Sequence, residues 1–287
     1  MEGPDPRDES YIDMHDAHPS EVHDPHLSGV RDNIHDYRDR PRQWYPNKAD
    51  SATKIWRYMD LGQFISLIQT NQLWFSHRSN FEDPYEGRYS KSAAKKILKR
   101  RYIEKEMLDE EMTEYIMDDD SDDYVSCWNM KESQSAALWQ IYVEGDNGIA
   151  IKSTVGALKE SLNFPSALEF NYERISGKVQ YHTTGDEPTG GYAPIFTKRD
   201  IYEHEREYRT VLTSYEPLDD IDVDGMKIKP KIGMGIELDP SILIDEVYIS
   251  PSASSYLGDV VETLQSDYGP DYPIKKSTVY DDPLPIS

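Results

Sequence analysis

The sequence predicts an α+β domain with a mixed, largely antiparallel sheet flanked by helices. Segments of branched and aromatic residues, typical of strands, alternate with segments of helical periodicity. A strand, a helix and a second strand follow one another within residues 55–76, which favours a compact sheet with an early crossover. The 21 Tyr, 6 Phe and 5 Trp are more aromatic residues than a wholly disordered chain carries.

The first elements have the clearest patterns. Residues 55–59 (IWRYM) are rich in aromatic and branched side chains and predict a strand. Residues 61–72 place their apolar side chains on one side of a helix that starts near Asp60. Residues 73–76 (LWFS) predict a second strand, which ends in a polar turn.

A charged stretch interrupts the predicted sheet. Residues 88–117 alternate charged and apolar side chains in a long helical pattern whose first half is basic. From Glu104 to Asp123 there are eleven acidic residues and one lysine. A neighbouring acidic segment more often neutralises a basic helix face than leaves it for binding. We therefore expect a solvated helical excursion at 88–123 and no strong non-specific nucleic-acid binding.

The rest of the chain returns to short strands and helices. Strands are predicted at residues 124–128, 148–151, 179–181, 208–212, 232–238, 244–249 and 274–279. Helical patterns cover residues 133–142, 153–162 and 254–268, with a turn of helix at 201–206. No internal repeat is visible, so residues 51–287 predict a single α+β domain.

The N-terminal residues 1–50 have a different composition. They contain six prolines, many aspartates and five of the eight histidines, without a sustained apolar period. We expect a disordered, acidic, histidine-rich tail. Histidine and aspartate at short spacing can hold a divalent metal loosely. Without a folded frame to fix their geometry, we expect no defined metal site.

Charge, apolar runs and cysteine content indicate the compartment in which we expect the protein. Acidic residues outnumber basic ones 54 to 31, which gives a net charge of −23 and suits a salt-rich, halophilic cytoplasm. The apolar runs are too short for a transmembrane helix, and the first residues (MEGPDPRDES) lack the pattern of a secretory signal. A single cysteine, Cys127, excludes a disulfide framework. We therefore expect a cytoplasmic protein without a membrane partner.

Side chains suited to chemistry gather in four stretches. In chain order they are Arg57 and Tyr58, then Ser76, Asp83 and Glu86, then Trp139 and Tyr142, and finally Lys198, Glu205, Glu207 and Arg209. The last stretch carries the strongest local signal, because Glu203, Glu205 and Glu207 would share one face in an extended conformation. Such carboxylates repel unless a cation or a substrate hydroxyl lies between them. The alternative is an exposed edge with mixed salt bridges.

The other stretches also have two interpretations. Residues 83–87 (DPYEG) have the composition of a turn, but Glu86 has no turn role, so we expect it to pair with an arginine such as Arg57. Arg209 continues the face of the glutamates and could pair with Glu207. Trp139 and Tyr142 lie three apart on one helix face, which suits either core packing or a stacking platform.

Taken in order, these stretches resemble the uncharacterised domain-of-unknown-function family 2971. The resemblance rests on WRY at 56–58, LWFS at 73–76, DPYEG at 83–87, SAALWQIY at 135–142, GIAI at 148–151, Lys198 and EREYR at 205–209. It covers about residues 55–285. Because the activity of that family is not settled, the resemblance implies a fold family rather than a function.

A looser similarity is to ADP-ribosyltransferases with an arginine–serine–glutamate layout. Arg57, Ser76 or Ser126, and the Glu-x-Glu of Glu205 and Glu207 occur in that order. The similarity implies a split sheet that binds NAD, with Glu207 catalytic, Glu205 orienting the acceptor and Arg57 anchoring NAD. It further implies a pocket lined by Tyr58, Ser76, Trp139 and Tyr142 and supported by Asp83, Glu86, Lys198 and Arg209.

The implied function is therefore an NAD-using transferase that acts as a toxin or antiviral-defence effector. Its partners would be a small-molecule nucleotide and an unknown macromolecular acceptor. Two alternatives stay open. One is a Mg²⁺-dependent nuclease using Asp83, Glu86, Glu205 and Glu207, with Lys198 nearby. The other is a non-catalytic binding or regulatory domain whose charged residues form a buried polar network.

Overall fold

The computed structural model describes residues 44–101, 117, 122–143, 145–166, 168, 172–214, 222–223, 226–227 and 232–281. Most of the predicted tail and most of the acidic half of the charged excursion lie outside these residues. The basic half is described as α3 (Lys91–Arg101). Among the described residues, no helix is both long and apolar enough to cross a bilayer.

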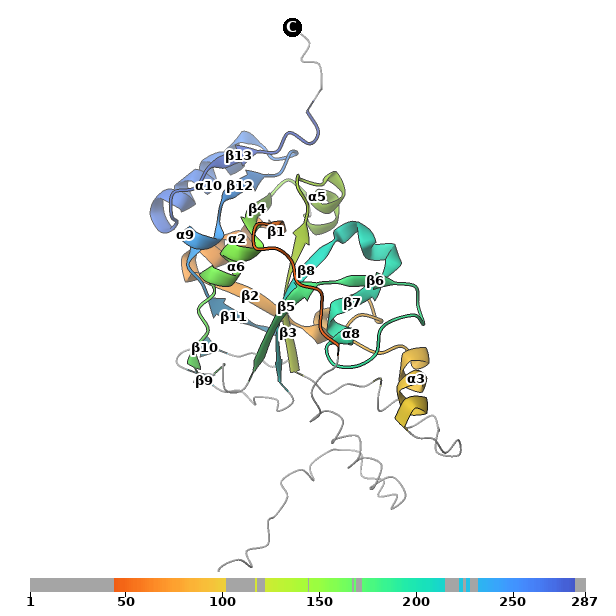
Figure 1. The fold of residues 1–287 in the computed structure, drawn as a ribbon. Coiled ribbons are helices and arrows are strands. Elements are labelled where there is room, and N and C mark those ends of the chain that lie inside the picture. The colour runs from red at the N-terminus through yellow and green to blue at the C-terminus, as the bar shows by residue number, and fades with distance from the viewer. Residues whose placement is uncertain are drawn as a thin grey trace, which may run out of the picture. The chain divides into compact units, whose positions relative to one another are not determined.

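The sheet is organised around one long strand, β3 (Asp122–Met130). Along one edge β3 pairs antiparallel with β8 (Glu207–Ser214), and β8 pairs antiparallel with β5 (Glu173–Lys178). The other edge is shared by two strands. β2 (Gln72–His77) pairs near one end of β3, and β1 (Lys54–Asp60) pairs near the other end. The sheet therefore forks at β3, as Figure 1 lets the reader follow.

Each branch of the fork continues outward. β2 pairs antiparallel with β11 (Gly233–Glu237). β1 pairs antiparallel with β4 (Gly148–Thr154), which pairs with β12 (Glu246–Ile249), and β12 pairs in parallel with β13 (Ile274–Lys276). This arrangement confirms the predicted α+β class with a mixed, largely antiparallel sheet. Since β1 and β2 both run antiparallel to β3, the helix between them makes the predicted early crossover.

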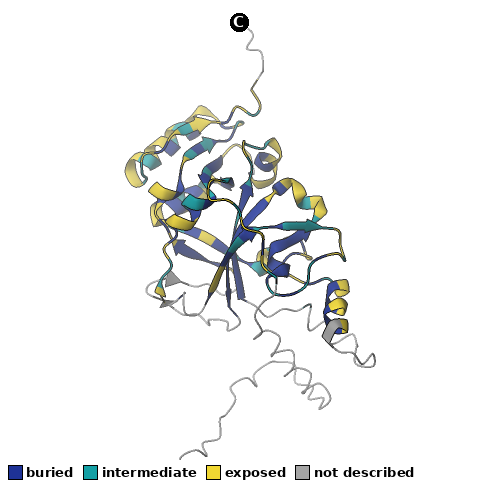
Figure 2. Ribbon diagram, in the orientation of Figure 1, coloured by how far each residue is buried: buried dark blue, intermediate teal, exposed yellow. Residues whose placement is uncertain are grey.

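One face of the sheet carries the main hydrophobic core. In β1, Ile55 and Met59 point to this face because side chains alternate along a strand. The face is covered by α2 (Leu61–Thr70), α6 (Val155–Ser161), α9 (Pro240–Leu243) and α10 (Ser255–Tyr268). Asp60 starts α2 with a capping box to Gln63, as the sequence predicts. Figure 2 shows the buried strands beneath these helices.

The opposite face is covered by two separate apolar clusters. Trp56 and Tyr58 of β1 pack under α5 (Ala136–Tyr142). Val125 and Val211 pack under α8 (Ala193–Phe196), which leads into β7 (Thr197–Arg199). Short β6 (Gln180–His182) pairs with β7, and the 3₁₀ helix η3 (Asp200–Glu205) follows. The charged candidates of β7, η3 and β8 therefore lie on the face that the two clusters share.

Three smaller features complete the described chain. The 3₁₀ helix η1 (Arg78–Asn80) follows β2 directly. The strands β9 (Asp222–Val223) and β10 (Met226–Lys227) form a separate two-stranded sheet. Before β1, Tyr45 packs against Tyr192 at 5.4 Å between ring centroids, and Asn47 forms a bridge with Lys178. Residues 44–50, which the sequence assigns to the tail, therefore contact the domain.

Candidate functional site

Arg57 lies in the fork of the sheet, where β1 leaves β3. Its Nη1 donates to Oγ of Ser126 in β3 at 2.6 Å, and its Nη2 donates to the carbonyl oxygen of Trp74 in β2 at 3.3 Å. The guanidinium also lies over the indole of Trp128, 5.8 Å from the ring centroid. One side chain thus joins both branches to β3. Burial lowers the pKa of Arg57.

Strand register brings β1 and β8 to the same stretch of β3. Asn129 is opposite Trp56 on one edge of β3 and opposite Glu207 on the other. Neighbouring strands are about 4.8 Å apart, so the backbones of Trp56 and Glu207 are about 10 Å apart. Two segments about 150 residues apart in the sequence therefore flank one row of the sheet. Because side chains alternate along a strand, Arg57 starts from the face of Ile55 and Met59, whereas Glu207 lies on the opposite face, with Trp56.

A cluster of five charged side chains lies beside this row. Nζ of Lys198 is 2.7 Å from Oε2 of Glu205, 2.8 Å from Oε1 of Glu207 and 3.3 Å from Oε2 of Glu86. Nε of Arg209 is 2.7 Å from Oε2 of Glu207, and its Nη2 contacts Glu86. All five are buried. We call Glu86, Lys198, Glu205, Glu207 and Arg209 the glutamate cluster.

The charges of the glutamate cluster balance only if one carboxyl group is protonated, because three glutamates face two cations. Burial, together with a hydrogen bond to Glu207, raises the pKa of Glu205. Burial also disfavours the charge of Glu207, but Arg209, the hydrogen bond from Glu205 and Lys198 lower its pKa well below the ordinary value. The pair therefore holds one proton, which resides on Glu205 while Glu207 is ionised.

Neighbouring residues fix the cluster on several sides. Nη1 of Arg209 donates to the carbonyl oxygen of Ile195 at 2.8 Å, and the backbone N–H of Glu207 donates to the Tyr181 hydroxyl at 2.8 Å. Lys198 lies 4.7 Å from the ring centroid of Tyr202, and Arg209 lies 5.1 Å from that of Phe81. Sequence reasoning missed these supporting residues, because neither a spacing nor a charge pattern links them to the glutamates.

Two expectations about these residues are wrong. Glu203, Glu205 and Glu207 do not share one extended face, because η3 runs through Glu205 and Arg206 has a positive φ of 47°. The turn leaves Glu203 exposed and buries the other two glutamates. Glu86 does pair with an arginine, but with Arg209 rather than Arg57. The predicted pairing of Arg209 with Glu207 is confirmed.

Asp83 belongs to a separate ion pair at the rim of the cluster. Its two carboxylate oxygens accept from Nη2 and Nε of Arg199 at 2.9 and 3.1 Å. The guanidinium of Arg199 lies 4.7 Å from the ring centroid of Tyr85 and 5.6 Å from that of Tyr202. Asp83 therefore orients Arg199 and the turn that carries Glu86.

The aromatic candidates around α5 divide into buried and exposed rings. Tyr58 and Trp139 are buried and pack edge to face at 5.0 Å, and the Tyr58 hydroxyl accepts from the backbone N–H of Ser135. Tyr142 exposes 41% of its surface. Loss of hydration and the negative charges of Glu207 and Glu205 raise the pKa of the Tyr142 hydroxyl. The charges of the glutamate cluster therefore act on the Tyr142 hydroxyl, although part of the ring is exposed to solvent.

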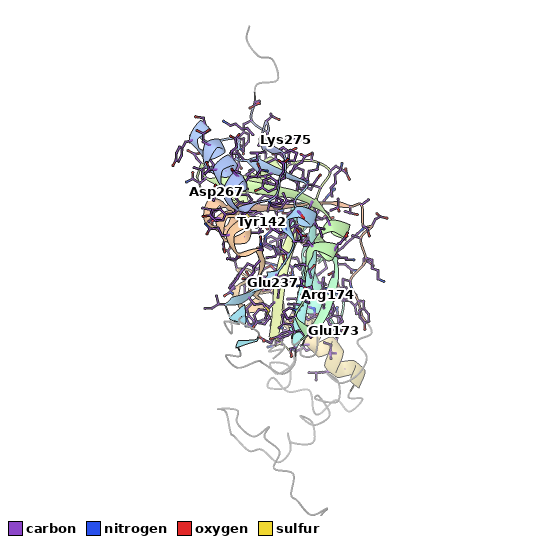
Figure 3. All side chains as sticks on the ribbon, turned by 90° about the vertical axis from the view of Figure 1, so that its left-hand side faces the viewer. Tyr142, Glu173, Arg174, Glu237, Asp267 and Lys275 are labelled. Atoms are coloured by element: carbon purple, nitrogen blue, oxygen red, sulfur yellow. The ribbon has the colours of Figure 1, made fainter. Side chains whose placement is uncertain are left out.

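A pocket of about 560 Å³ lies beside Tyr142, between the start of α2 and the end of α5. Its lining includes Asp60, Gln63, Ile141 and Asn147. Figure 3 shows Tyr142 well apart from Glu173 and Arg174 of β5. The remaining candidate, Ser76, lies in β2 opposite Val125, and therefore on the same face as the glutamate cluster.

The carboxylates of the site are bound to cations of the protein itself. Asp83 is bound to Arg199, whereas Glu86, Glu205 and Glu207 are bound to Lys198 or Arg209. Within the described part of the chain, no group of three or more His, Cys, Asp or Glu could hold a metal ion. The geometry therefore does not favour the arrangement of carboxylates that a Mg²⁺-dependent nuclease would need.

No family model matches the sequence, and no curated protein matches it either. The similarity to domain-of-unknown-function family 2971 therefore stays a prediction. Three solved structures of DarT from Thermus sp. 2.9 are similar to this chain. The complex with NAD⁺ has 9% identity and a TM-score of 0.34, and the match covers 82% of this chain and 98% of that chain.

The other two are complexes of the same DarT. The complex with ADP-ribosylated ssDNA has 11% identity, a TM-score of 0.32 and coverage of 81% and 97%. The complex with carba-NAD⁺ has 11% identity, a TM-score of 0.33 and coverage of 79% and 96%. Because the identities and TM-scores are this low, we base the functional argument on this chain's own residues.

Proposed function

We propose that this chain is an NAD-using enzyme of the ADP-ribosyltransferase type. One observation carries the proposal. The fork of the sheet holds a guanidinium, Arg57, and strand register brings the backbone of Glu207, in β8, to the same stretch of β3, with the two side chains starting from opposite faces of the sheet. A cationic anchor and an ionised carboxylate are the two groups that cleavage of the nicotinamide–ribose bond most needs.

The residues fit these roles. Arg57 uses two N–H groups for Ser126 and Trp74, so further N–H groups of the same guanidinium can bind a phosphate or ribose oxygen. The role of Ser126 is to orient Arg57. Ser76, on the neighbouring branch, adds a hydroxyl on the face of the glutamate cluster. NAD supplies the bond that breaks, and the protein supplies binding and electrostatics.

Glu207 acts as the catalytic carboxylate in this proposal. It is ionised, because Arg209, Glu205 and Lys198 lower its pKa. Positive charge develops on the ribose as the glycosidic bond breaks, and a fixed carboxylate stabilises that charge. Both oxygens of Glu207 contact cations, so a ribose hydroxyl must replace the Lys198 contact. Arg209, bound also to Glu86, then holds the carboxylate in place.

Glu205 has a complementary role because its pKa is raised. A carboxyl group that carries a proton near neutral pH can exchange it with the acceptor group of a macromolecule. The exposed ring of Tyr142, beside the pocket, provides an aromatic surface, while the buried Tyr58 and Trp139 hold α5 in position. We propose that an unidentified macromolecule is the acceptor and that the enzyme acts as a toxin or defence effector.

A second function is favoured by one specific observation. The glutamate cluster satisfies its own charges, as a structural network in a non-catalytic binding or regulatory domain would. The two functions differ in their response to NAD. A transferase binds NAD and consumes it, whereas a structural network leaves NAD unchanged.

Calorimetric titration with NAD, followed by incubation of a cell lysate with isotope-labelled NAD, tests the proposal. We expect binding by the wild-type protein and a mass increase of one ADP-ribose group on protein or nucleic acid in the lysate. The Glu207→Gln variant should bind NAD but transfer no label. Absence of both binding and transfer in the folded wild-type protein would leave the binding domain as the better account.

A further inference from the structure

Ser79 is an exposed serine in η1, two residues after β2 ends, and lies outside the glutamate cluster. Its Oγ lies 2.7 Å from Nδ1 of His77, the residue that caps η1. His77 and Asp122 are both buried, and Nε2 of His77 lies 3.0 Å from Oδ1 of Asp122. A hydroxyl, an imidazole and a carboxylate therefore form a continuous series of contacts from the solvent into the protein.

The hydrogen bonds determine which nitrogen carries the proton. The backbone N–H of Ser79 donates to Nδ1 of His77 at 3.2 Å. A backbone N–H can only donate, so Nδ1 is the acceptor and the proton of the neutral ring is on Nε2, where it is donated to Asp122. Oγ of Ser79 lies 2.7 Å from this acceptor, so its hydroxyl is within reach to donate to Nδ1. This is the arrangement in which an imidazole can act as a general base for a hydroxyl.

Asp122 and the imidazole of His77 are held in position by their neighbours. The second oxygen of Asp122, Oδ2, accepts from the Tyr172 hydroxyl at 2.8 Å. The ring of Tyr124 packs edge-on against the imidazole of His77 at 5.2 Å. Although burial raises the pKa of Asp122, its hydrogen bonds to His77 and Tyr172 lower it, so Asp122 is the ionised partner. An ionised, immobilised carboxylate orients the imidazole and stabilises the imidazolium.

We propose that Ser79, His77 and Asp122 form a nucleophilic serine site that accepts acyl groups from small esters. Oγ of Ser79 attacks the ester carbonyl, its proton passes to Nδ1 of His77, and the carbon–oxygen bond to the leaving alcohol breaks as that alcohol takes the proton. Water then attacks the acyl-serine, gives a proton to Nδ1, and releases the carboxylic acid while Oγ recovers its proton. The proposal does not depend on NAD chemistry.

The chain contains a matched comparison for this site. Ser241 is also exposed and also lies two residues after a helix-capping residue, Asp239. Its backbone N–H and Oγ both contact Oδ1 of Asp239, at 2.8 and 2.6 Å. The two serines thus have the same local geometry, but only Ser79 contacts an imidazole that is backed by a carboxylate. If the contact at Ser79 served capping alone, the two hydroxyls would be equally reactive.

The test is labelling of the full chain with a fluorophosphonate probe, quantified by peptide mass spectrometry at both serines in one sample. The reaction forms an Oγ–P bond and releases fluoride, while the Ser79 proton leaves through His77. General-base assistance is worth about 100-fold or more, so we expect Ser79 to be labelled about 100-fold faster than Ser241. Equal rates at the two serines would overturn the proposal.

Two variants separate chemistry from capping. The His77→Asn variant keeps a good capping side chain for η1 but removes the base, so labelling of Ser79 should fall to the rate of Ser241. The Ser79→Ala variant should lose hydrolysis of p-nitrophenyl acetate above the rate of buffer. Retained labelling in the folded His77→Asn variant, or retained hydrolysis in Ser79→Ala, contradicts the proposal. The comparison within the wild-type protein stands even where a variant does not fold.

Discussion

Nζ of Lys198 lies 2.8 Å from Oε1 of Glu207, and both side chains are buried. This contact joins β7 to the start of β8 and connects Glu207 to the other two carboxyl groups of the glutamate cluster through one ammonium group. The same contact must open if Glu207 is to bind a ribose hydroxyl. Lys198 therefore links the stability of the domain to the proposed catalysis.

Removal of the Lys198 charge should destabilise the domain strongly. The Lys198→Met variant leaves the negative charge of buried glutamates incompletely balanced, so we expect a loss of about 3–5 kcal/mol in the free energy of unfolding. Urea denaturation measures it. The control is Lys54→Met, because Lys54 pairs with the exposed Glu132 and should contribute no more than about 1 kcal/mol. Equal losses in the two variants would argue against a tightly coupled cluster.

The two glutamates should respond differently to replacement by glutamine. Glu205 carries the shared proton, so the neutral side chain of the Glu205→Gln variant preserves the charge balance and should cost about 1 kcal/mol or less. Glu207 is ionised between Arg209 and Lys198, so the Glu207→Gln variant should cost about 3 kcal/mol or more. Denaturation of both variants at neutral pH measures the difference. The reverse order of stability would place the proton on Glu207.

The stability difference between wild type and Glu205→Gln should depend on pH. Because the pKa of Glu205 is raised in the folded state, the folded protein binds a proton more tightly than the unfolded chain does. The contribution of Glu205 to stability therefore falls as pH rises above the ordinary value of 4.5. The variant should gain stability relative to wild type over this range. Denaturation at several pH values measures the difference in free energy of unfolding between the two proteins. A difference that does not change with pH would contradict the raised pKa of Glu205.

Arg57 should be required for NAD binding but not for the fold of β3. The Arg57→Lys variant keeps the charge but cannot reach Ser126 and Trp74 together with a ligand, so we expect about 10-fold weaker binding or more in calorimetry. The Ser126→Ala variant, which removes only the oxygen that orients Arg57, should have a smaller effect. Unchanged affinity in Arg57→Lys would remove Arg57 from the site.

Local patterns were sufficient to predict much of the fold. Asp60 caps α2 as its spacing indicates, and the alternation in residues 55–59 corresponds to the two faces of β1. The fork could not be predicted, because it depends on which parts of β3 pair with β1 and β2. Short strands such as β5 lack a strong apolar signal, since Glu173 and Arg174 open it.

The candidate site was predicted as a set of residues rather than as a geometry. The charges of Lys198, Glu205, Glu207 and Arg209 are visible in the sequence, and all four meet in the structure. The positive φ of Arg206 is not visible, and it decides which glutamates are buried. Glu86 pairs with Arg209, which is more than a hundred residues away in the sequence. The two side chains meet because the turn at residues 83–87 packs against β8.

The central claim is that an ionised Glu207 beside the fork cleaves the bond between nicotinamide and ribose. Its most direct test is the rate of nicotinamide release from NAD by wild type, by Glu207→Gln and by Glu203→Gln, each shown to be folded by circular dichroism. Glu203 is the control, because it is exposed and lies only two residues before Glu205. We expect equal rates of nicotinamide release for wild type and Glu203→Gln. The rate for Glu207→Gln should be lower by a factor of about 100 or more. Release by Glu207→Gln at the wild-type rate, or no release by wild type, would contradict the account.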